Sequence, residues 1–454
     1  MGLKYVEQIK SIALFVLVFL SITLTFSIWT YKPNYDTIEP PKVFDSSIGK
    51  QLQMSDIIKP YRMLFHMNGK WKGTNENVKM ESILSEMKKW ELSDLTLVSN
   101  NLDDKKLNEL IGVNNRMTLF YTGEIPFPVF LQNLLPTQNK KINEAAFNHM
   151  IIDWNKLNNS SMSNNELIVF FANSKNNKLY KAKIKVQSGK QFQTNVLTVA
   201  KSFPNYLEIE REGAKSFYLP AKASSIPKYT YIIEPDPVNS YKNALFTNPN
   251  IVKRSPDEVT GTEKYTDDKS LMTIDVTKKT LNFVNTSIVE NKEKALESDL
   301  ILNTFSFINE HGGWTGDFRY SEVDYGNQKV TYQMYLKDQP VFSDRSVTLT
   351  EISTYWDWGN DRISKYYRPY YQPVPIPLVR NDGKLMSGPE AIEKLKDRKD
   401  INFEDIEEIR SGFYLTKNAN PNLFTLEPMW FYSINGKWER LSPVIAGGGQ
   451  IGLE

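Results

Sequence analysis

The chain has 454 residues, of which 40% are hydrophobic and 12% aromatic, a composition that suits folded domains and argues against long disorder. Its 55 basic and 53 acidic residues give a formal net charge of +2, so it lacks the broad basic field that nucleic-acid binding requires. The absence of cysteine excludes disulfides, thiolate metal sites, iron–sulfur clusters and a cysteine nucleophile. The length predicts two or three domains.

The first predicted element is a transmembrane helix over residues 11–31, which carry no charge. At 1.5 Å per residue this segment is about 31 Å long, close to the thickness of a hydrocarbon core. Lys4 and Lys10 precede it, so the positive-inside rule places residues 1–10 in the cytoplasm and the bulk of the chain outside. Bulky residues such as Phe26 occupy the region where cleavage needs small ones, which favours an uncleaved signal anchor over a cleaved signal peptide.

Large apolar residues recur along this helix at alternating spacings of four and three, which aligns them in one seam. The seam consists of Phe15, Phe19, Ile22, Phe26 and Trp29. Small hydroxyl residues also stand four apart, Ser21 with Thr25 and Thr23 with Ser27. One interpretation is that the helix packs on other membrane helices, which makes the seam a candidate partner-binding surface. The other is that the bulky residues face lipid and the hydroxyls bond to their own backbone.

Beyond a proline-containing linker over residues 32–44, the outer region begins with a mixed α/β domain over residues 45–247. A helix is predicted where apolar residues recur at helical spacing from Met80 to Trp90. Two strands, 167–172 and 179–186, predict a hairpin whose second strand alternates apolar residues with lysines. The lysine row is either a solvated sheet face or an anion-binding stripe.

The rest of the chain predicts two α+β domains, a central one over residues 248–372 and a C-terminal one over 373–454. The same order of elements, a helix followed by an antiparallel meander, occurs in both. The central domain has a hairpin over 271–284, a helix over 298–310 and strands at 318–323, 329–336 and 347–355. The C-terminal domain has an opening strand at 376–379, a helix from Ser387 and strands at 408–415, 423–434 and 437–441. Glu390 gives this helix a capping-box spacing, and Asn435-Gly436 is a strong hairpin turn.

Residues that carry chemistry are sparse. The three histidines, His66, His149 and His311, are far apart and lack metal-ligand spacing, so they are interpreted as structural or exposed. No nucleotide-binding glycine motif and no nucleophile elbow are present. We therefore assign no catalytic, cofactor-binding or metal-binding residue and expect a protein that is not an enzyme.

An aromatic cluster is the best candidate for a small-molecule site. It comprises Trp356, Trp358 and the tyrosines between Tyr366 and Tyr371. Outside a cell, these rings are suited to stacking on the sugars of a wall polymer, or they pack the chain against a sheet. The first interpretation supports an alternative function, an extracytoplasmic binding module for cell-wall polymer or a wall hydrolase.

Two segments carry a resemblance to a known family. Residues 27–36 (SIWTYKPNYD) follow the predicted span directly, and residues 426–432 (LEPMWFY) precede 435–438 (NGKW). Both resemble the YycH (WalH) family of Gram-positive bacteria. The resemblance implies three outer domains, of which the later ones are shared with a related single-pass protein, YycI. It also implies a non-enzymatic accessory protein of the WalK (YycG) sensor histidine kinase, which with its response regulator WalR (YycF) controls cell-wall metabolism.

The leading hypothesis is therefore a single-pass membrane protein with a cytoplasmic N-terminus and an extracytoplasmic bulk. It regulates a WalK-like sensor histidine kinase through transmembrane-helix contacts and acts with a YycI-like partner. A homo- or hetero-dimer is compatible with this hypothesis, whereas nucleic acid and cofactors are not expected.

Overall fold

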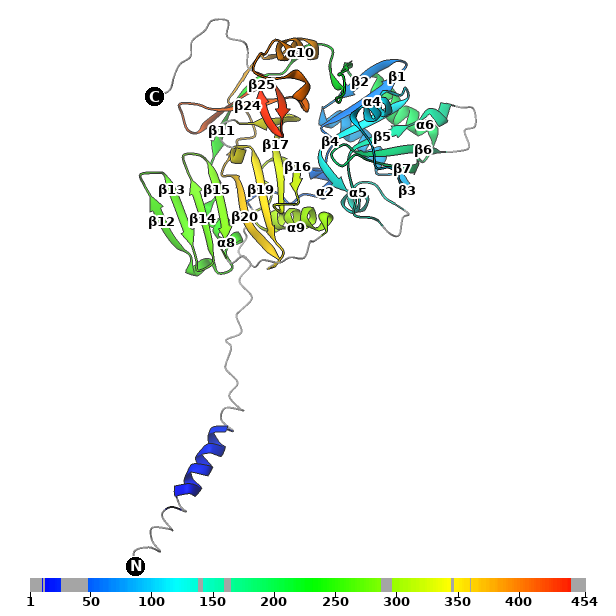
Figure 1. The fold of residues 1–454 in the computed structure, drawn as a ribbon. Helices are drawn as coiled ribbons and strands as arrows, with labels where there is room; N and C mark the ends of the chain where they lie inside the picture. The colour runs from blue at the N-terminus through cyan, green and yellow to red at the C-terminus, as the bar shows by residue number, and fades with distance from the viewer. Residues whose placement is uncertain are drawn as a thin grey trace, which may run out of the picture. The chain divides into compact units, whose positions relative to one another are not determined.

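The computed structural model describes residues 10, 13–25, 48–137, 142–158, 165–286, 296–343, 347–359 and 361–441. The chain divides into two compact units, Met1–Asp45 and Ser46–Glu454. In the first unit residues 13–25 are helical and form the dark blue helix of Figure 1. The second unit, which we call the body, holds all the other helices and strands described below.

The predicted transmembrane helix over residues 11–31 is described in its central part, since residues 11, 12 and 26–31 lie outside the described residues. Within the described part of the chain, none of the helices combines the length and the apolar character that a membrane crossing requires. The membrane span therefore stays a prediction.

The first lobe of the body is built on an antiparallel sheet of nine strands. These are β1 (Arg62–Met67), β2 (Lys70–Thr74), β3 (Glu91–Ser99), β4 (Arg116–Pro126), β5 (Ala146–Asp153), β6 (Glu166–Asn173), β7 (Lys178–Lys185), β8 (Asn205–Ile209) and β9 (Phe217–Pro220). They are arranged in the order β3-β7-β6-β5-β4-β1-β2-β8-β9. Its helices are α2 (Met54–Ile57), α3 (Asn77–Met87), α4 (Asp104–Gly112), α5 (Phe127–Asn133), η1 (Asn155–Asn158), α6 (Gly189–Phe192), η2 (Gln193–Leu197) and α7 (Thr198–Lys201).

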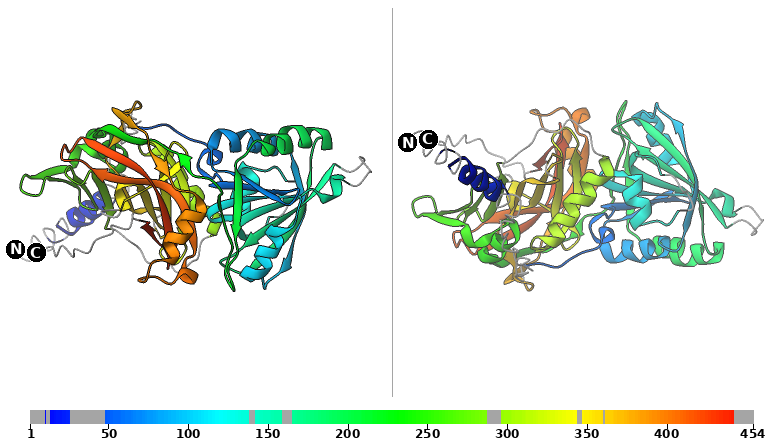
Figure 2. Two further views of the ribbon diagram at one scale, coloured as in Figure 1. Left: turned by 90° about the horizontal axis from the view of Figure 1, so that it is seen from above. Right: turned by 90° about the horizontal axis from the view of Figure 1, so that it is seen from below.

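Helices cover both faces of this sheet (Figure 2), because its central strands are apolar on both sides. On β1, Met63 and Phe65 belong to one buried cluster, together with Met80 and Ile83 of α3. Leu64, between them in sequence, points to the opposite face and joins a second cluster with α4. The helix that the spacing from Met80 predicts is thus confirmed as α3, buried on its apolar side.

The predicted hairpin of the first lobe is confirmed as β6 and β7. Its second strand alternates buried apolar residues with exposed lysines, as expected. Of the lysine row, Lys183 lies 2.9 Å from a carboxylate oxygen of Asp94 on the neighbouring strand β3, and both side chains are exposed. The row is therefore a solvated sheet face with a local counter-charge.

The second lobe is built on a larger mixed sheet of fifteen strands. These are β11 (Lys228–Glu234), β12 (Lys253–Asp257), β13 (Thr262–Thr266), β14 (Ser270–Asp275), β15 (Thr280–Asn285), β16 (Asp317–Asp324), β17 (Lys329–Leu336), β18 (Gln339–Phe342), β19 (Glu351–Asp357), β20 (Arg362–Pro369), β21 (Gln372–Pro373), β22 (Val379–Asn381), β24 (Glu408–Lys417), β25 (Leu423–Ile434) and β26 (Lys437–Arg440). The main path runs β12-β13-β14-β15-β20-β19-β17-β18-β24-β25-β11-β21. A parallel pairing of β18 with β24 joins its two halves.

Shorter elements complete the second lobe. They are the strand pair β10 (Ser224–Ser225) and β23 (Lys384–Leu385), the helices α8 (Val238–Leu245), α9 (Glu297–Glu310) and α10 (Gly388–Lys396), and the 3₁₀ turns η3 (Pro249–Ile251), η4 (Val347–Leu349) and η5 (Phe403–Asp405). The fold is α+β, as the sequence predicts.

The predicted repeat of a helix and a meander is present. In the first copy α9 precedes β16 and β17, and β17 then pairs with β19. In the second copy α10 precedes β24, β25 and β26, which pair in sequence order. Ser387 and Glu390 form the predicted capping box, and Asn435 and Gly436 both adopt positive φ, as a tight hairpin turn requires.

The boundary between the sheets differs from the predicted boundary at residue 247. Residues 228–234 lie within the predicted first domain, yet strand β11, which they form, pairs with β25, β22 and β21 of the second sheet. Its pattern of Tyr229, Tyr231 and Ile233 buried on one face suits either sheet, so only the long-range pairing reveals where it belongs. The division into three domains stays a prediction.

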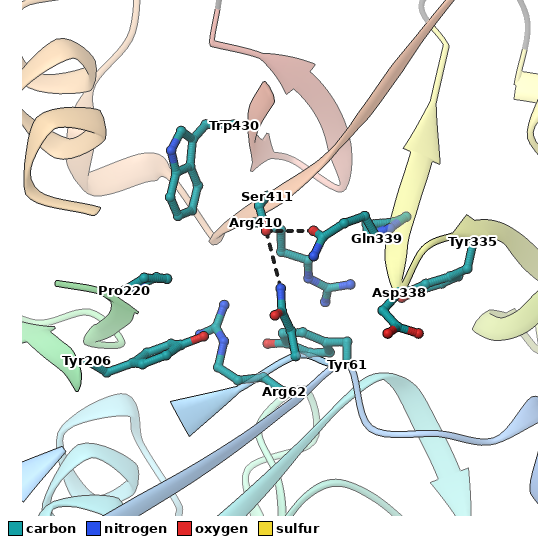
Figure 3. A pocket seen from close by; sticks show the side chains of 12 residues that line it. Tyr61, Arg62, Tyr206, Pro220, Tyr335, Asp338, Gln339, Arg410, Ser411 and Trp430 are labelled. Carbon is teal, nitrogen blue, oxygen red and sulfur yellow. Dashed lines mark hydrogen bonds between the residues drawn. The ribbon is translucent and has the colours of Figure 1, made fainter. Parts of the chain in front are cut away.

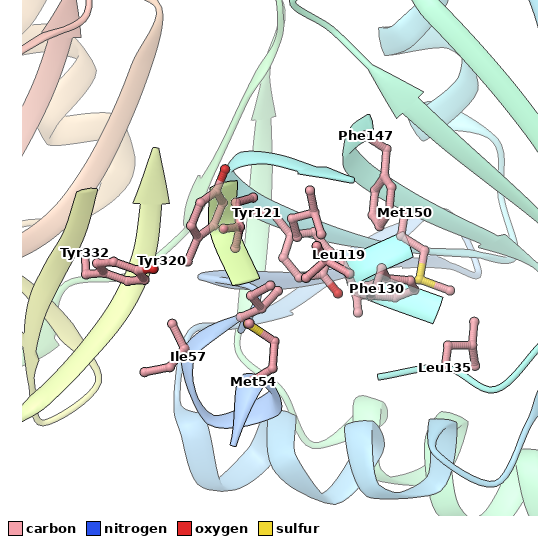
Figure 4. Close-up of a cluster of buried hydrophobic side chains, with 14 of the residues drawn as sticks. Met54, Ile57, Leu119, Tyr121, Phe130, Leu135, Phe147, Met150, Tyr320 and Tyr332 are labelled. Carbon is pink, nitrogen blue, oxygen red and sulfur yellow. The ribbon is translucent and has the colours of Figure 1, made fainter. Parts of the chain in front are cut away.

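The two lobes meet at one apolar core, shown in Figure 4. Ile57 of α2 and Tyr121 of β4 belong to the same buried cluster as Tyr320 of β16. Tyr320 also donates from its hydroxyl to the carbonyl oxygen of Glu124, at 2.6 Å. Gly123 permits this approach, since a Cβ there would lie 2.6 Å from the carbonyl oxygen of Ser321.

A second contact joins β9 of the first lobe to α10 of the second. Phe217 and Leu219 are buried with Ile392 and Leu395 in a separate cluster. Gly388 at the start of α10 again allows backbone to approach, because a Cβ there would lie 2.4 Å from Cβ of Leu219. The lobes are thus held at two places.

Candidate functional site

The predicted partner-binding seam is described in part. Phe15, Phe19 and Ile22 lie on the helix over residues 13–25, with 74%, 62% and 58% of their surface exposed. Phe26 and Trp29 lie outside the described residues.

Two small hydroxyl residues of the same helix, Thr23 and Thr25, bond to their own backbone. Thr23 donates to the carbonyl oxygen of Phe19 at 2.5 Å, and Thr25 donates to that of Ser21 at 2.7 Å. Because each hydroxyl has a single proton, neither donor is available to a partner helix in this conformation.

The aromatic cluster packs inside the second lobe. Tyr366, Tyr370 and Tyr371 are each at most 4% exposed, and the hydroxyl of Tyr371 donates to the carbonyl oxygen of Leu349 at 2.8 Å. Trp356 and Trp358 are half-buried against the main core. Three of the proposed stacking rings are therefore interior, which supports packing over a sugar-binding platform.

The histidines occupy three separate environments. His66 stacks on Trp71 and its Nδ1 lies 2.8 Å from the carbonyl oxygen of Gly112. His311 follows α9 and its Nδ1 lies 2.9 Å from the carbonyl oxygen of Phe307. His149 lies on β5, at the boundary between the lobes. Among the described residues no group of three or more side chains is placed to hold a metal ion.

Between the two contacts that join the lobes lies a cleft of about 420 Å³. Its walls come from segments far apart in sequence. The first lobe contributes Tyr61, Arg62, Leu107, Asn108, Ile111, Phe120, Tyr121, Thr122, Asn148, His149, Ser174, Lys175, Lys215, Ser216, Phe217 and Tyr218, and the second Ser321, Glu322, Glu407, Glu408, Ile409, Arg410, Ser433, Gly436 and Trp438. This volume is in the range of small-molecule sites.

A buried ion pair forms the second-lobe wall of the cleft. Arg410 holds Glu408 through two parallel contacts, Nε to Oε1 and Nη2 to Oε2, each 2.5 Å long. Burial alone would raise the pKa of Glu408, but Arg410 outweighs it and holds that pKa below its ordinary value. The two charges therefore neutralise each other.

Tyr61 lies between two guanidinium groups at this wall. The Arg410 carbon Cζ is 3.6 Å from the centre of the Tyr61 ring, and that of Arg62 is 5.2 Å away. Figure 3 shows these three side chains from a smaller adjoining cavity of about 30 Å³. There Ser411 donates to Gln339 at 2.7 Å and accepts from Asn75 at 3.4 Å, and the contact with Asn75 crosses between the lobes.

Two basic residues of the cleft are bound to neutral groups. Arg62 donates from Nη2 to the carbonyl oxygen of Ile409 at 3.3 Å. Lys215 donates from Nζ to the hydroxyl of Ser174 at 3.1 Å. Within the described part of the chain, neither one forms an ion pair with a carboxylate.

The pKa of His149 is lowered by burial and by the nearby positive charges. Its Nδ1 lies 2.8 Å from the amide oxygen of Asn148, and since that oxygen only accepts, Nδ1 carries the proton. Burial, then Lys215 and to a lesser degree Arg62, lower the pKa of His149 from 6.5 to about 3, while Glu408 opposes them. The ring is therefore neutral at pH 7, and its Nε2 is an acceptor.

The mouth of the cleft is crossed by an exposed ion pair. Lys175, in the turn between β6 and β7, lies 3.5 Å from Glu322 of β16. Both side chains are about half exposed or more, at 49% and 61%. This pair contributes little to stability but places opposite charges on the two lobes at the opening.

Sequence reasoning missed this cleft. In the sequence His149 stands out only as one of three scattered histidines. The residues Arg62, Lys215, Glu408 and Arg410 are single charged residues in or beside ordinary strands. They meet only because β1, β9 and β24 are brought together by the contact of the lobes. The one local signal is that Glu408 and Arg410 stand two apart on a strand and so share a face.

The architecture defines an α+β protein of two joined lobes, with a charged cleft between them and an N-terminal helix in a separate unit. Residues 7–196 match the family described as YycH protein, N-terminal domain, and residues 214–447 match YycH protein, C-terminal domain. The chain belongs to the YycH family.

Similar proteins agree with this assignment. Over 443 residues the chain is 24% identical to the "Two-component system WalR/WalK regulatory protein YycH" of Bacillus subtilis (strain 168), which covers 95% of each chain. The crystal structure of YycH from Bacillus subtilis matches with a TM-score of 0.71 at 19% identity, over 87% of this chain and 99% of that one. At this identity the structural match shows the fold alone.

Proposed function

We propose that this protein is a membrane-anchored, non-enzymatic regulator of a WalK-like sensor histidine kinase that controls cell-wall metabolism. The observation that carries the proposal is membership of the YycH family over both lobes, together with a similar protein named as a regulatory protein of the WalR/WalK system. A YycI-like single-pass protein acts with it, as the family resemblance implies.

The N-terminal helix is the surface through which regulation takes place. Residues 11–31 cross the membrane with residues 1–10 in the cytoplasm, so the body is extracytoplasmic. The apolar seam of Phe15, Phe19 and Ile22 supports a helix–helix contact, because these side chains are exposed. The hydroxyls of Thr23 and Thr25 are bonded to their own backbone. Regulation follows if the helix binds one signalling state of the kinase more tightly than the other.

A matched pair of triple variants tests the helix contact. Phe15, Phe19 and Ile22 are replaced by alanine in one, and Leu17, Leu20 and Leu24, on the opposite side of the same helix, in the other. Each is expressed in cells in place of the native chain, and kinase output is measured with a reporter of response-regulator activity. We expect the seam variant to lose most of the regulation and the opposite-face variant to keep it, at equal membrane levels. Equal output from both would contradict the helix contact, and unchanged output on deletion of the whole chain would contradict the regulatory function.

A further inference from the structure

We propose that the cleft between the lobes binds a small molecule carrying one oxyanion group, a carboxylate or a phosphate, with Arg62 and Lys215 as its anion-binding residues. This inference rests on the geometry of the body and is independent of the helix contact.

Arg62 is held in place, and among the described residues it uses only part of its hydrogen-bonding capacity. A guanidinium has five N–H donors, and the one described bond of Arg62 goes to the carbonyl oxygen of Ile409. Its Cζ lies 5.2 Å and 5.6 Å from the ring centres of Tyr61 and Phe120, which fix the plane of the group. A fixed guanidinium with free donors matches a carboxylate or a phosphate, which accept two parallel bonds.

Lys215 supplies a second positive charge to the same cleft. Its ammonium group has three donors, and the one described bond goes to the hydroxyl of Ser174. Lys215 is half-buried, and a cation that is partly withdrawn from water interacts more strongly with an anion than an exposed one does. Burial is the main cause of the lowered pKa of His149, and Lys215 and, to a lesser degree, Arg62 add to it, so both cations lie within electrostatic reach of that ring.

The carboxylates of the cleft offset only part of the charge of these two cations. Glu408 is held by both contacts to Arg410. Glu407 accepts from the backbone nitrogen of Gly436 at 3.0 Å, in the β25–β26 turn of the second lobe. Glu322 is paired with Lys175 at the mouth. The inner cleft thus has three basic and two acidic side chains, an excess of one positive charge that suits a single oxyanion.

The other residues that line the cleft indicate the chemistry of the rest of the ligand. Leu107 and Ile111 of α4, with Phe120 and Tyr218, provide an apolar surface. The neutral ring of His149 presents Nε2 as an acceptor, which favours a ligand with a hydroxyl or an amide N–H. A volume of about 420 Å³ holds a molecule of the size of an acylated amino acid or a polyol phosphate.

Titration calorimetry on the full-length chain in detergent micelles tests the proposal and separates the two kinds of oxyanion. The probes are N-acetylalanine for the carboxylate and glycerol 3-phosphate for the phosphate, with N-acetylalanine amide and glycerol as uncharged counterparts. We expect one anion at least to bind, with an affinity that falls as salt is raised, and its uncharged counterpart not to bind.

Variants locate the site. Arg62→Gln and Lys215→Gln are each expected to weaken binding of the anion about tenfold, which is the loss of roughly one charge-assisted hydrogen bond. Arg62→Lys, which keeps the charge, is expected to bind between wild type and Arg62→Gln. The exposed residues Arg380 and Lys201 provide matched controls as Arg380→Gln and Lys201→Gln. Thermal melting of each variant confirms that the body is folded. Absence of binding by both anions at about 10 mM, a limit set by the weakest useful affinity, would overturn the proposal, as would unchanged affinity in both glutamine variants.

Discussion

Two arginines of this protein lie in contrasting surroundings, Arg368 in the interior of the second lobe and Arg62 at the cleft. Arg368 is fully buried and donates to the carbonyl oxygen of Gly313, the hydroxyl of Tyr366 and the hydroxyl of Thr315, at 3.1, 2.6 and 2.8 Å. Arg62 donates once, to a carbonyl at the edge of a cavity. The first arginine organises the fold, whereas the second retains donors for something else.

The surroundings of Arg368 explain why its charge has a structural role. Asp236, which is buried close by, accepts from Tyr241 at 2.9 Å and from Gln372 at 2.8 Å. Burial would lower the pKa of Arg368, but Tyr241, Tyr366 and Asp236 reverse that effect and raise it, so the charge is permanent. A permanent charge with three hydrogen bonds from its two terminal nitrogens ties β20 to the turn after α9, and its role is structural.

The largest expected effect therefore comes from the interior. Arg368→Met removes three hydrogen bonds and leaves Asp236 without a nearby cation, so we expect a loss of about 3–5 kcal/mol in the free energy of unfolding. Urea unfolding followed by circular dichroism measures it, with Arg62→Met expected to cost less than about 1 kcal/mol. Equal losses in the two variants would remove the distinction between a structural and an available arginine.

The contact that closes the cleft gives the next effect. Gly123→Ala places a Cβ against the carbonyl oxygen of Ser321 and the ring of Tyr320, which separates the lobes, so we expect a loss of about 1–3 kcal/mol. Gly112→Ala in α4 is the matched control, since a Cβ there meets no atom within 4 Å. A neutral Gly123→Ala variant would mean that the lobes are not held at this distance in solution.

The smallest effect concerns pH and arises in the cleft. The folded-state pKa of His149 is lowered from 6.5 to about 3, so between these values the unfolded chain binds one more proton than the folded protein does. Stability from this group is complete above pH 6.5 and is lost as the pH falls through that window, by about 1 kcal/mol at pH 5.5. His149→Gln is expected to remove this part of the pH dependence of the urea midpoint. An unchanged dependence would show that the ring is accessible to protons.

Local signals in the sequence predicted much of the fold. The capping box at Ser387 and Glu390 and the turn at Asn435-Gly436 act within a few residues, and both are present. The hairpin of β6 and β7 follows from alternation in one strand. The parallel pairing of β18 with β24 and the place of β11 depend on contacts far apart in sequence, and no short pattern encodes them.

The candidate site was beyond sequence reasoning for the same reason. Arg62 and Lys215 are separated by more than 150 positions along the chain and carry no motif. Their importance comes from the absence of a carboxylate partner among the described residues, and this absence is visible only once the neighbouring side chains have been placed. The predicted seam, in contrast, needs only the period of one helix, and as a partner-binding surface it stays a prediction.

The most direct test of the central claim uses His149 as a reporter inside the cleft. The chain has three histidines, so selective labelling gives three imidazole signals in an NMR titration. Adding the anion that binds is predicted to shift the His149 signal and raise the pKa of that ring, because the oxyanion offsets the charges of Lys215 and Arg62, while His66 and His311 stay unchanged. In Arg62→Gln the shift is predicted to need about ten times more anion. An anion that binds without moving the His149 signal, or that moves it equally in Arg62→Gln, would contradict the claim that the cations of the cleft form an anion site.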